Sequence, residues 1–274
     1  MVLVLLVSIP TLAISALNVL GTAGVCPYVV VTSRGVLTSA AVDNVPSVAN
    51  DIDAHGCDIG DYVVTSGTVV SYLNIHDANK YGIFVDSPAT AITVTISHVA
   101  VYNIGNHDVT GNVTGNFAPN GVQTGIGIIF DSGASGPQLS GSITNSNIYA
   151  YQKNGIVINH NSNVTTTGNT VTGLGHVDYI AQNGIEYARD AIGVIRQNVV
   201  SGNYYTGNTG VLANGDPCGG AFPRCPPGRQ YVAVGILLVL IDPNQIQRGQ
   251  NDLNAPYPND NQRNFAVITD SATD

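Results

Sequence analysis

The sequence predicts an all-β protein in which short parallel strands stack as repeated turns of a solenoid. Three observations predict this fold class. The 274-residue chain has only 10% charged residues, among them two lysines and one glutamate, so it lacks the residues that cover solvated helix faces. It is rich in Gly, Val, Ile, Thr and Asn, which favour strands and turns. One short phrase also recurs along the chain, which is typical of a repeat architecture.

Composition also narrows the choice of partners. The formal net charge is −9 and the nine basic residues are scattered, whereas nucleic-acid binding needs a clustered basic footprint. We therefore expect no nucleic-acid partner, and we expect a monomer.

The N-terminus predicts export. Residues 2–20 are nearly all apolar and are followed by the small residues Gly21 and Ala23, as in a signal peptide cleaved after Ala23. Residues 1–23 are thus assigned to a signal peptide, and the mature protein is expected to be secreted or held at the cell surface. The alternative is an N-terminal membrane anchor, because about 20 apolar residues span a bilayer. After cleavage, no membrane partner is expected.

Four cysteines, Cys26, Cys57, Cys218 and Cys225, follow this segment. An even number of cysteines in an exported chain favours disulfides. The simplest of the three pairings is local, Cys26 with Cys57 and Cys218 with Cys225. A zinc site is the weaker alternative, because no C-x-x-C pair or nearby histidine cluster accompanies the cysteines.

The recurring phrase centres on a Gly-Ile pair and marks one strand of each repeat. Gly155 and Gly184 are 29 residues apart, and Gly127 and Gly155 are 28 apart. A unit this short cannot bury its own apolar face, so the copies are expected to stack and to pair in parallel at about 4.8 Å. The five copies occupy residues 81–86, 126–131, 154–159, 183–188 and 234–239.

A second phrase follows each of the first four copies, so each unit holds at least two strands. It occupies residues 97–99, 146–148, 168–170 and 197–199. Stacked Asn147, Asn169 and Asn198, joined by His98, predict an inward ladder of amides. Residues 24–61 are expected to form an N-terminal cap that shields the first open edge, and residues 62–274 the repeat domain with its C-terminal cap.

These phrases, among them Asn183-Gly184-Ile185, resemble the parallel β-helix repeats of the pectate-lyase-like superfamily. Residues 180–185 are most similar to its secreted, largely uncharacterised bacterial members. The resemblance covers roughly residues 62–270 and implies a single-stranded right-handed parallel β-helix with loop insertions on one edge. It is specific for the fold and not for an activity. A β-sandwich is the alternative, but it needs antiparallel hairpins and does not predict identical rungs.

Chemistry is expected at the outward positions of the Gly-Ile strand, because stacked Ile and Val fill the inside. Counting two and four residues after each glycine places Asp86 and Asp131 in one column on adjacent rungs, with Asn159 and His160 beside them. Such a pair suits calcium as a cofactor, or acid and base roles in glycoside cleavage. Asp86, Asp131 and Glu186 are therefore the candidate catalytic residues. The structural alternative is that Asp and Asn end strands because they suit turns.

Long insertions at residues 106–120, 173–182 and 203–229 enter at one corner of successive rungs, so they are expected to rim a groove. The candidate substrate-binding residues are His107, His176, Asp178 and Tyr179 at the start of the Gly-Ile strand, and His160, Arg189 and Asp190 at its end. The alternatives are solvated loop histidines and an exposed Glu186–Arg189 ion pair of little energetic weight.

The resemblance does not identify catalytic residues in this sequence. Superfamily hydrolases that cut polygalacturonan share Asn-Thr-Asp, Asp-Asp, Gly-His-Gly and Arg-Ile-Lys motifs. Here Gly175-His176-Val177 lacks the second glycine, and the Asp-Asp and Arg-Ile-Lys motifs are absent. Two functions stay open: an exported polysaccharide lyase or hydrolase, or a non-catalytic module that binds glycans or builds a surface layer. Extracellular polysaccharide is the expected partner in both.

Overall fold

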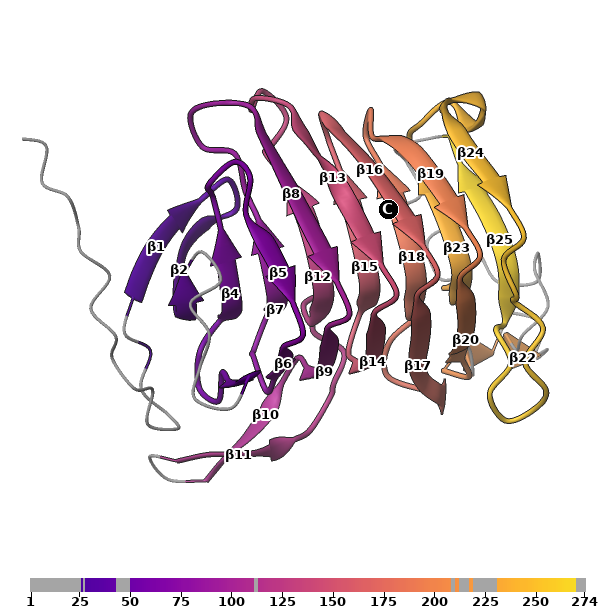
Figure 1. The fold of residues 1–274 in the computed structure, drawn as a ribbon. Coiled ribbons are helices and arrows are strands. Elements are labelled where there is room, and N and C mark those ends of the chain that lie inside the picture. Colours follow the sequence, from indigo (N-terminus) through magenta and orange to yellow (C-terminus); the bar gives the residue numbers. More distant parts are fainter. Residues whose placement is uncertain are drawn as a thin grey trace, which may run out of the picture.

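The computed structural model describes residues 26, 28–42, 50–110, 113–207, 210–211, 217–218 and 231–269. Within these ranges there is no α-helix, and the strands form three large sheets and two small hairpins. Figure 1 shows the strands side by side as a ladder, from β1 and β2 at one end to β24 and β25 at the other. The predicted all-β class with parallel strands is confirmed, and the arrangement is compatible with a solenoid.

Three sheets contain nearly all the strands. Sheet A has the order β1 (Tyr28–Thr32), β2 (Gly35–Val42), β4 (Ile59–Val63), β7 (Tyr81–Val85), β12 (Ile126–Asp131), β15 (Asn154–Asn159), β18 (Asn183–Ala188), β23 (Val234–Val239) and β25 (Arg263–Ile268). Sheet C has the order β24 (Ile246–Gly249), β19 (Ile192–Arg196), β16 (Ser162–Thr167), β13 (Leu139–Thr144), β8 (Ile92–Ser97) and β5 (Val69–Ser71). Sheet B has the order β20 (Val199–Tyr205), β17 (Thr170–Val177), β14 (Asn147–Tyr151), β9 (Ala100–Ile104), β6 (Asn74–His76) and β3 (Asp51–Asp53).

The remaining elements are short. The strands β10 (His107–Thr110) and β11 (Val113–Phe117) form an antiparallel hairpin that projects from the ladder in Figure 1. The strands β21 (Gly210–Val211) and β22 (Pro217–Cys218) form a second hairpin, and a 3-10 turn, η2, spans Pro243–Gln245. No helix in the described part of the chain is long and apolar enough to cross a membrane.

Successive strands along the chain belong to sheets A, C and B in a repeating order. Strands β7, β8 and β9 are followed by β12, β13 and β14, then by β15, β16 and β17, and then by β18, β19 and β20. Each unit therefore has three strands, and the two sequence phrases mark only those of sheets A and B. The strands of sheet C were not predicted from the repeat, because they share no recurring phrase. They only alternate buried apolar residues with outward polar residues.

The Gly-Ile phrases align in register across sheet A, as the sequence predicts. Ile128 of β12 pairs with Ile156 of β15, and the residues one and three places after each glycine are buried in one apolar core shared by the three sheets. A Cβ atom on Gly127 would lie 2.5 Å from Ile148 Cγ2 of sheet B and 2.6 Å from the carbonyl oxygen of Gly155. The glycine is therefore required by the close approach of sheets A and B.

A buried amide ladder runs along the corner between sheets C and B. Asn198 Oδ1 accepts hydrogen bonds from the backbone N–H and from Nδ2 of Asn169, both at 3.0 Å. Asn251 continues the ladder by accepting from Asn198 Nδ2 at 3.1 Å, and Ser146 begins it by donating its N–H to Asn169 Oδ1 at 3.0 Å. Each side chain thus satisfies backbone groups of a neighbouring turn that would otherwise be buried without a partner.

Two residues expected in this ladder lie outside it. The register pairs Asn147 with Ala100, so Ser146 occupies the ladder level and the Asn147 side chain is exposed. His98 is exposed as well. The expectation for these two residues is wrong because the register places Ser146 and Val99 level with Asn169, and a one-residue slip in a strand reverses the face on which a side chain lies.

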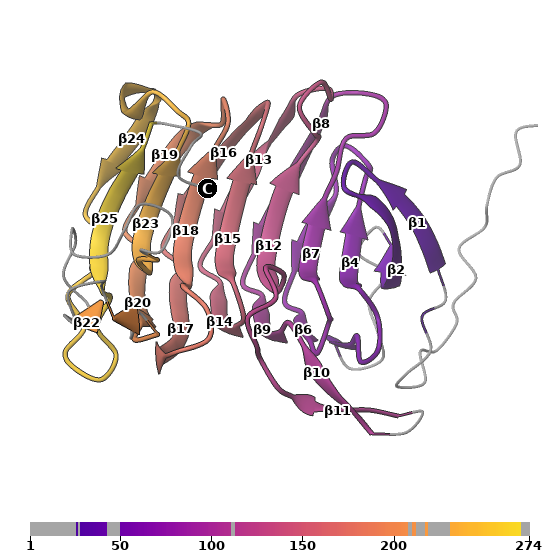
Figure 2. The same ribbon diagram turned by 180° about the vertical axis from the view of Figure 1, so that it is seen from behind.

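The hairpin of β1 and β2 ends sheet A beside β4 (Figure 2), and its side chains pack on the outward residues of the neighbouring strands. Val30 and Leu37 of this hairpin belong to an apolar cluster with Phe84 and Ile129 of sheet A. Within the expected cap region, β3 and β4 already pair in parallel with β6 and β7.

A disulfide joins Cys26 to Cys57, with 5.4 Å between their Cα atoms, which confirms the first predicted pairing. Cys225, the side chain of Cys218 and the expected signal peptide (1–23) lie outside the described residues. A structural disulfide is the kind of bond that persists in oxidising compartments.

Three glutamines fasten the insertions between sheets B and A. Gln152 Oε1 accepts the backbone N–H groups of Asn106 and Asn120, at 3.1 and 3.0 Å, and so closes the loop that carries β10 and β11. Gln182 and Gln262 accept backbone N–H groups from the next two insertions in the same way.

Candidate functional site

Asp86 and Asp131 lie in one column on adjacent rungs, since their preceding residues Val85 and Phe130 pair in the sheet. Both side chains are buried. The outward residues Phe84 and Ile129 of the same strands are also fully buried. The first rungs of sheet A therefore present a covered surface rather than an open groove.

Asp86 holds the tip of the β1–β2 hairpin. Its Oδ2 accepts the N–H of Ser33 at 2.9 Å and the hydroxyl of Tyr62 at 3.0 Å, and its Oδ1 accepts the N–H of Ser87 at 2.8 Å. These neutral donors satisfy a buried carboxylate without a metal ion.

Asp131 is the centre of a charged cluster at the same tip. Its Oδ2 accepts from Arg34 Nε at 2.6 Å and from Asn159 Nδ2 at 3.1 Å, and its Oδ1 lies 2.7 Å from His160 Nδ1. Burial alone would raise the pKa of Asp131, but Arg34, the N–H of Gly133 and His160 outweigh burial and hold that pKa below its usual range. The predicted neighbours of the column, Asn159 and His160, therefore contact Asp131, and Arg34 links this carboxylate to the hairpin.

Glu186 stands three strands from Asp86 in sheet A and is half-buried. Its Oε2 accepts from Asn154 Nδ2 at 2.6 Å and from Asn183 Nδ2 at 3.3 Å. Arg189 and Asp190 follow β18 and are exposed. The three candidate acids are thus spread along sheet A, with Asp86 directly after β7, Asp131 at the end of β12 and Glu186 in β18.

The loop residues fall into two separate places. His107 is buried beside Asp77, whereas His176 Nε2 lies 2.9 Å from Asp260 Oδ1 and stacks on Tyr204 with 3.8 Å between the ring centroids. Asp178 and Tyr179 lie in the connection before β18, where Asp178 is exposed and Tyr179 half-buried. Both histidines therefore have partners and are not simply solvated.

A different face carries an open concavity. A shallow groove of about 600 Å³ runs along the corner between sheets C and B. One rim is the corner column Tyr72, His98, Asn145 and Gly168, and the other is the first outward column of sheet B, Asn74, Ala100, Asn147 and Thr170. These pairs come from four successive rungs, so the groove is about 15 Å long at the spacing of paired strands. The described residues that line it include no Asp, Glu, Lys or Arg.

The corner column of the groove is conformationally costly. Tyr72, His98 and Asn145 have positive φ angles of 57°, 54° and 50°. Such angles are uncommon outside glycine, but the same corner position has a positive φ on the next three rungs as well, at Gly168, Gln197 and Gln250, so the angle belongs to the turn of the repeat. The conformation turns the Tyr72 and His98 rings outward, where they stack on each other with 5.0 Å between centroids. What distinguishes the groove is therefore the set of aromatic and amide side chains that this turn presents, and not the backbone angle.

An aromatic column lies next to the groove on sheet B. His76 and Tyr102 stack with 4.9 Å between centroids, and Tyr102 and Tyr149 stack at the same distance. These three residues occupy the second outward position of β6, β9 and β14.

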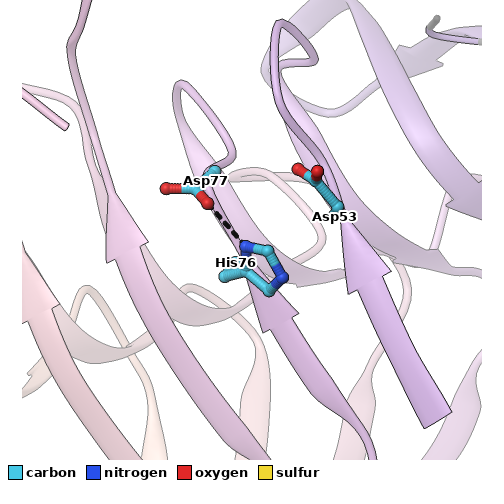
Figure 3. Close-up of side chains that lie close together, drawn as sticks. All are labelled: Asp53, His76 and Asp77. Atoms are coloured by element: carbon cyan, nitrogen blue, oxygen red, sulfur yellow. Dashed lines mark hydrogen bonds and ion pairs between the residues drawn. The ribbon is translucent and has the colours of Figure 1, made fainter. Parts of the chain in front are cut away.

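A histidine–aspartate cluster closes the end of this column, and Figure 3 shows its members Asp53, His76 and Asp77. His76 Nδ1 lies 2.5 Å from Asp77 Oδ2, and His76 Nε2 lies 3.3 Å from Asp51 Oδ2. The hydrogen bond with Asp77, against the opposing effect of burial, raises the pKa of His76 to about 9. Burial would raise the pKa of Asp77, but its bonds with His107 and His76 hold it well below its usual range.

The sequence did not predict a site on this face, because the chemistry was expected at the outward positions of the Gly-Ile strand, which lies in sheet A. A signal was present: in the sheet B strands an aromatic residue follows Ile or Val at Ile75-His76, Val101-Tyr102 and Ile148-Tyr149. The three aromatic residues fall into one column only in the register of the structure, in which Asn147 pairs with Ala100.

Comparison of the chain with protein-family models, curated proteins and solved structures found no match.

Proposed function

We propose that this protein is an exported right-handed parallel β-helix of the pectate-lyase-like type that binds extracellular polysaccharide along the groove between sheets C and B. The observation that carries the proposal is the open groove itself, whose rim presents the Tyr72 and His98 rings and the Asn145 amide on an exposed face. The cyclic order of the sheets supports the fold, since parallel crossovers are right-handed in nearly all proteins.

The chemistry of the groove favours a glycan. Amides from Asn74, Asn145 and Asn147 offer donors and acceptors to sugar hydroxyls, and the Tyr72 and His98 rings offer apolar surface with a polar edge. The groove is open and runs along the stack, so an extended chain fills it better than a compact small molecule, which prefers an enclosed cavity.

The negative charge of the protein favours a neutral polysaccharide over an acidic one. The chain carries a net charge of −9, and Asp51, Asp53 and Asp77 lie at one end of sheet B. A polyuronate would meet like charge on approach, whereas a neutral glycan would not. The proposed ligand is therefore a neutral polysaccharide. Export is supported by the apolar N-terminal sequence and by the Cys26–Cys57 disulfide.

Retention on immobilised polysaccharides tests this function. The full mature chain is applied to cellulose, xylan, mannan and, as the acidic comparison, polygalacturonate. We expect saturable retention on at least one neutral polymer, weakened about tenfold by Tyr72→Ala and by Asn147→Ala, because each change removes one aromatic or amide contact. Asn163→Ala is the matched control, because Asn163 is an exposed asparagine on sheet C. Equal retention of all variants, or retention on polygalacturonate alone, contradicts the proposal.

Cleavage of the polymer is the second candidate. It would use the candidate acids Asp86, Asp131 and Glu186, of which the first two are buried and hold the β1–β2 hairpin. The same incubations are therefore assayed for reducing and unsaturated ends. Their release, and its loss in Glu186→Gln, would favour a hydrolase or lyase over a binding module.

A further inference from the structure

The groove between sheets C and B follows a straight line, because its rims are columns of a parallel ladder. The strand register places four residues of its sheet B rim side by side in the order Asn74, Ala100, Asn147 and Thr170. Paired strands lie about 4.8 Å apart, so these four positions cover about 15 Å. A polymer that contacts all four rungs must therefore be extended over that length.

Amide groups recur on this rim at every second rung. Asn74 and Asn147 are exposed asparagines, whereas Ala100 on the rung between them offers only a methyl group. Each amide can both donate to and accept from a hydroxyl group. Because two rungs span about 10 Å, the rim offers hydrogen bonds at that interval and an apolar contact halfway between them.

This interval suits one class of glycan. In an extended chain of 1,4-linked β-pyranoses each sugar is turned over relative to the one before it, so the same ring edge returns at every second sugar. The length of two such sugars is close to that of two rungs. A chain along the rim would present equivalent hydroxyl groups to Asn74 and Asn147, and the ring of the sugar between them to Ala100.

The opposite rim offers aromatic surface to the same chain. Tyr72 is 67% exposed, and its ring stacks on that of His98, which is also exposed. Aromatic rings of this kind supply apolar surface to the ring faces of sugars and a polar edge to their hydroxyl groups. Glucans with α-1,4 or β-1,3 linkages coil, so a chain of either kind leaves a straight line and cannot follow both rims.

We propose that the groove selects a linear 1,4-linked β-glycan, whose axis lies along the stack of rungs. Asn74 and Asn147 bind the first and third of three consecutive sugars, and Ala100 contacts the second. This inference rests on the proposed function, because it names the linkage of the polysaccharide that the same groove binds. It is decided by the preference among linkages and by the length of chain that is needed.

Calorimetric titration of the full mature chain with oligosaccharides of two to five sugars tests the inference. Cello- and manno-oligosaccharides carry the β-1,4 linkage, and malto- and laminari-oligosaccharides are the α-1,4 and β-1,3 comparisons. We expect the affinity for at least one β-1,4 series to rise about tenfold from the disaccharide to the trisaccharide, because only the trisaccharide reaches both asparagines. Asn74→Ala and Asn147→Ala should each abolish this step, while the disaccharide still binds through the remaining amide.

Asn163→Ala is the matched control, because it removes an exposed asparagine from sheet C and should leave the step unchanged. The inference is overturned by malto- or laminari-oligosaccharides that bind as tightly as the β-1,4 series, by the absence of the step, or by a step that survives both substitutions in the groove. In these cases glycan binding stands and only the linkage assignment fails. Absence of binding by every oligosaccharide and polymer would contradict the proposed function as well.

Discussion

Asp131→Asn should loosen the contact between the tip of the β1–β2 hairpin and the end of β12. The substitution keeps the shape of the side chain but removes the charge that pairs with Arg34 Nε at 2.6 Å and that faces His160 Nδ1 at 2.7 Å. Loss of one partner of a fully buried pair costs about 3–5 kcal/mol. The Arg34 side chain is 34% exposed and that of Asp131 is 2% exposed. Water can therefore still solvate the guanidinium after the carboxylate charge is removed, and we expect a cost of about 2 kcal/mol.

Hydrogen exchange of the β1 and β2 amides measures this cost directly, because exchange reports the free energy of local opening. A cost of about 2 kcal/mol corresponds to exchange roughly 30-fold faster in the hairpin. Asp58→Asn is the control, since the Lys80–Asp58 pair at 3.2 Å is more exposed at 37% and 21% and should contribute under about 1 kcal/mol. If Asp131→Asn accelerates exchange no more than Asp58→Asn does, the carboxylate does not anchor the hairpin.

The same contact predicts the acid sensitivity of the hairpin. The folded-state pKa of Asp131 is depressed below its unfolded value of about 3.9. At pH values between these two pKa values, the folded state therefore binds fewer protons than the unfolded state. Its contribution to stability is full above about pH 4 and is lost as the pH falls through the folded pKa. Hairpin protection in the wild type should therefore fall below pH 4, and Asp131→Asn should flatten this dependence.

Three further substitutions or treatments test the fold. Gly127→Ala places a methyl group 2.5 Å from the Ile148 side chain and against backbone, and should destabilise the protein by about 3 kcal/mol in chemical denaturation, whereas insensitivity would contradict the close approach of sheets A and B. Asn198→Ala leaves a buried N–H without its acceptor and should cost about 1–3 kcal/mol in the same assay; a neutral effect would argue against the ladder. Reduction of the Cys26–Cys57 disulfide, which spans 31 residues, should lower stability by about 3–4 kcal/mol, and an unchanged midpoint in reductant would refute its role.

The sequence predicts the architecture of sheet A well because its determinants are local and periodic. The Gly-Ile phrase repeats, so its register, its inward Ile and Val residues and the column that holds Asp86 and Asp131 follow from counting residues. The same counting cannot show that Ser33 and Arg34 lie on that column, because these contacts join residues 53 to 98 positions apart through a unique hairpin.

The candidate site was less predictable for a related reason. The groove rim formed by Tyr72, His98 and Asn145 has no shared residue type, and its common feature is a backbone angle. The cluster around His76 likewise depends on Asp51 and Asp53 of β3 lying beside β6, within a region expected to be only a cap. Single histidines and aspartates do not recur at a fixed spacing in the sequence. Their proximity therefore becomes visible only when the pairing of β3 with β6 is known.

A crystal structure of the complex with a neutral oligosaccharide, chosen as the longest soluble fragment of the polymer that retains the protein, tests the central claim most directly. The proposal predicts sugar density along the groove between sheets C and B, in contact with Tyr72, Asn145 and Asn147. Sugar bound instead over sheet A beside Glu186, or no sugar bound at saturating concentration, would contradict it.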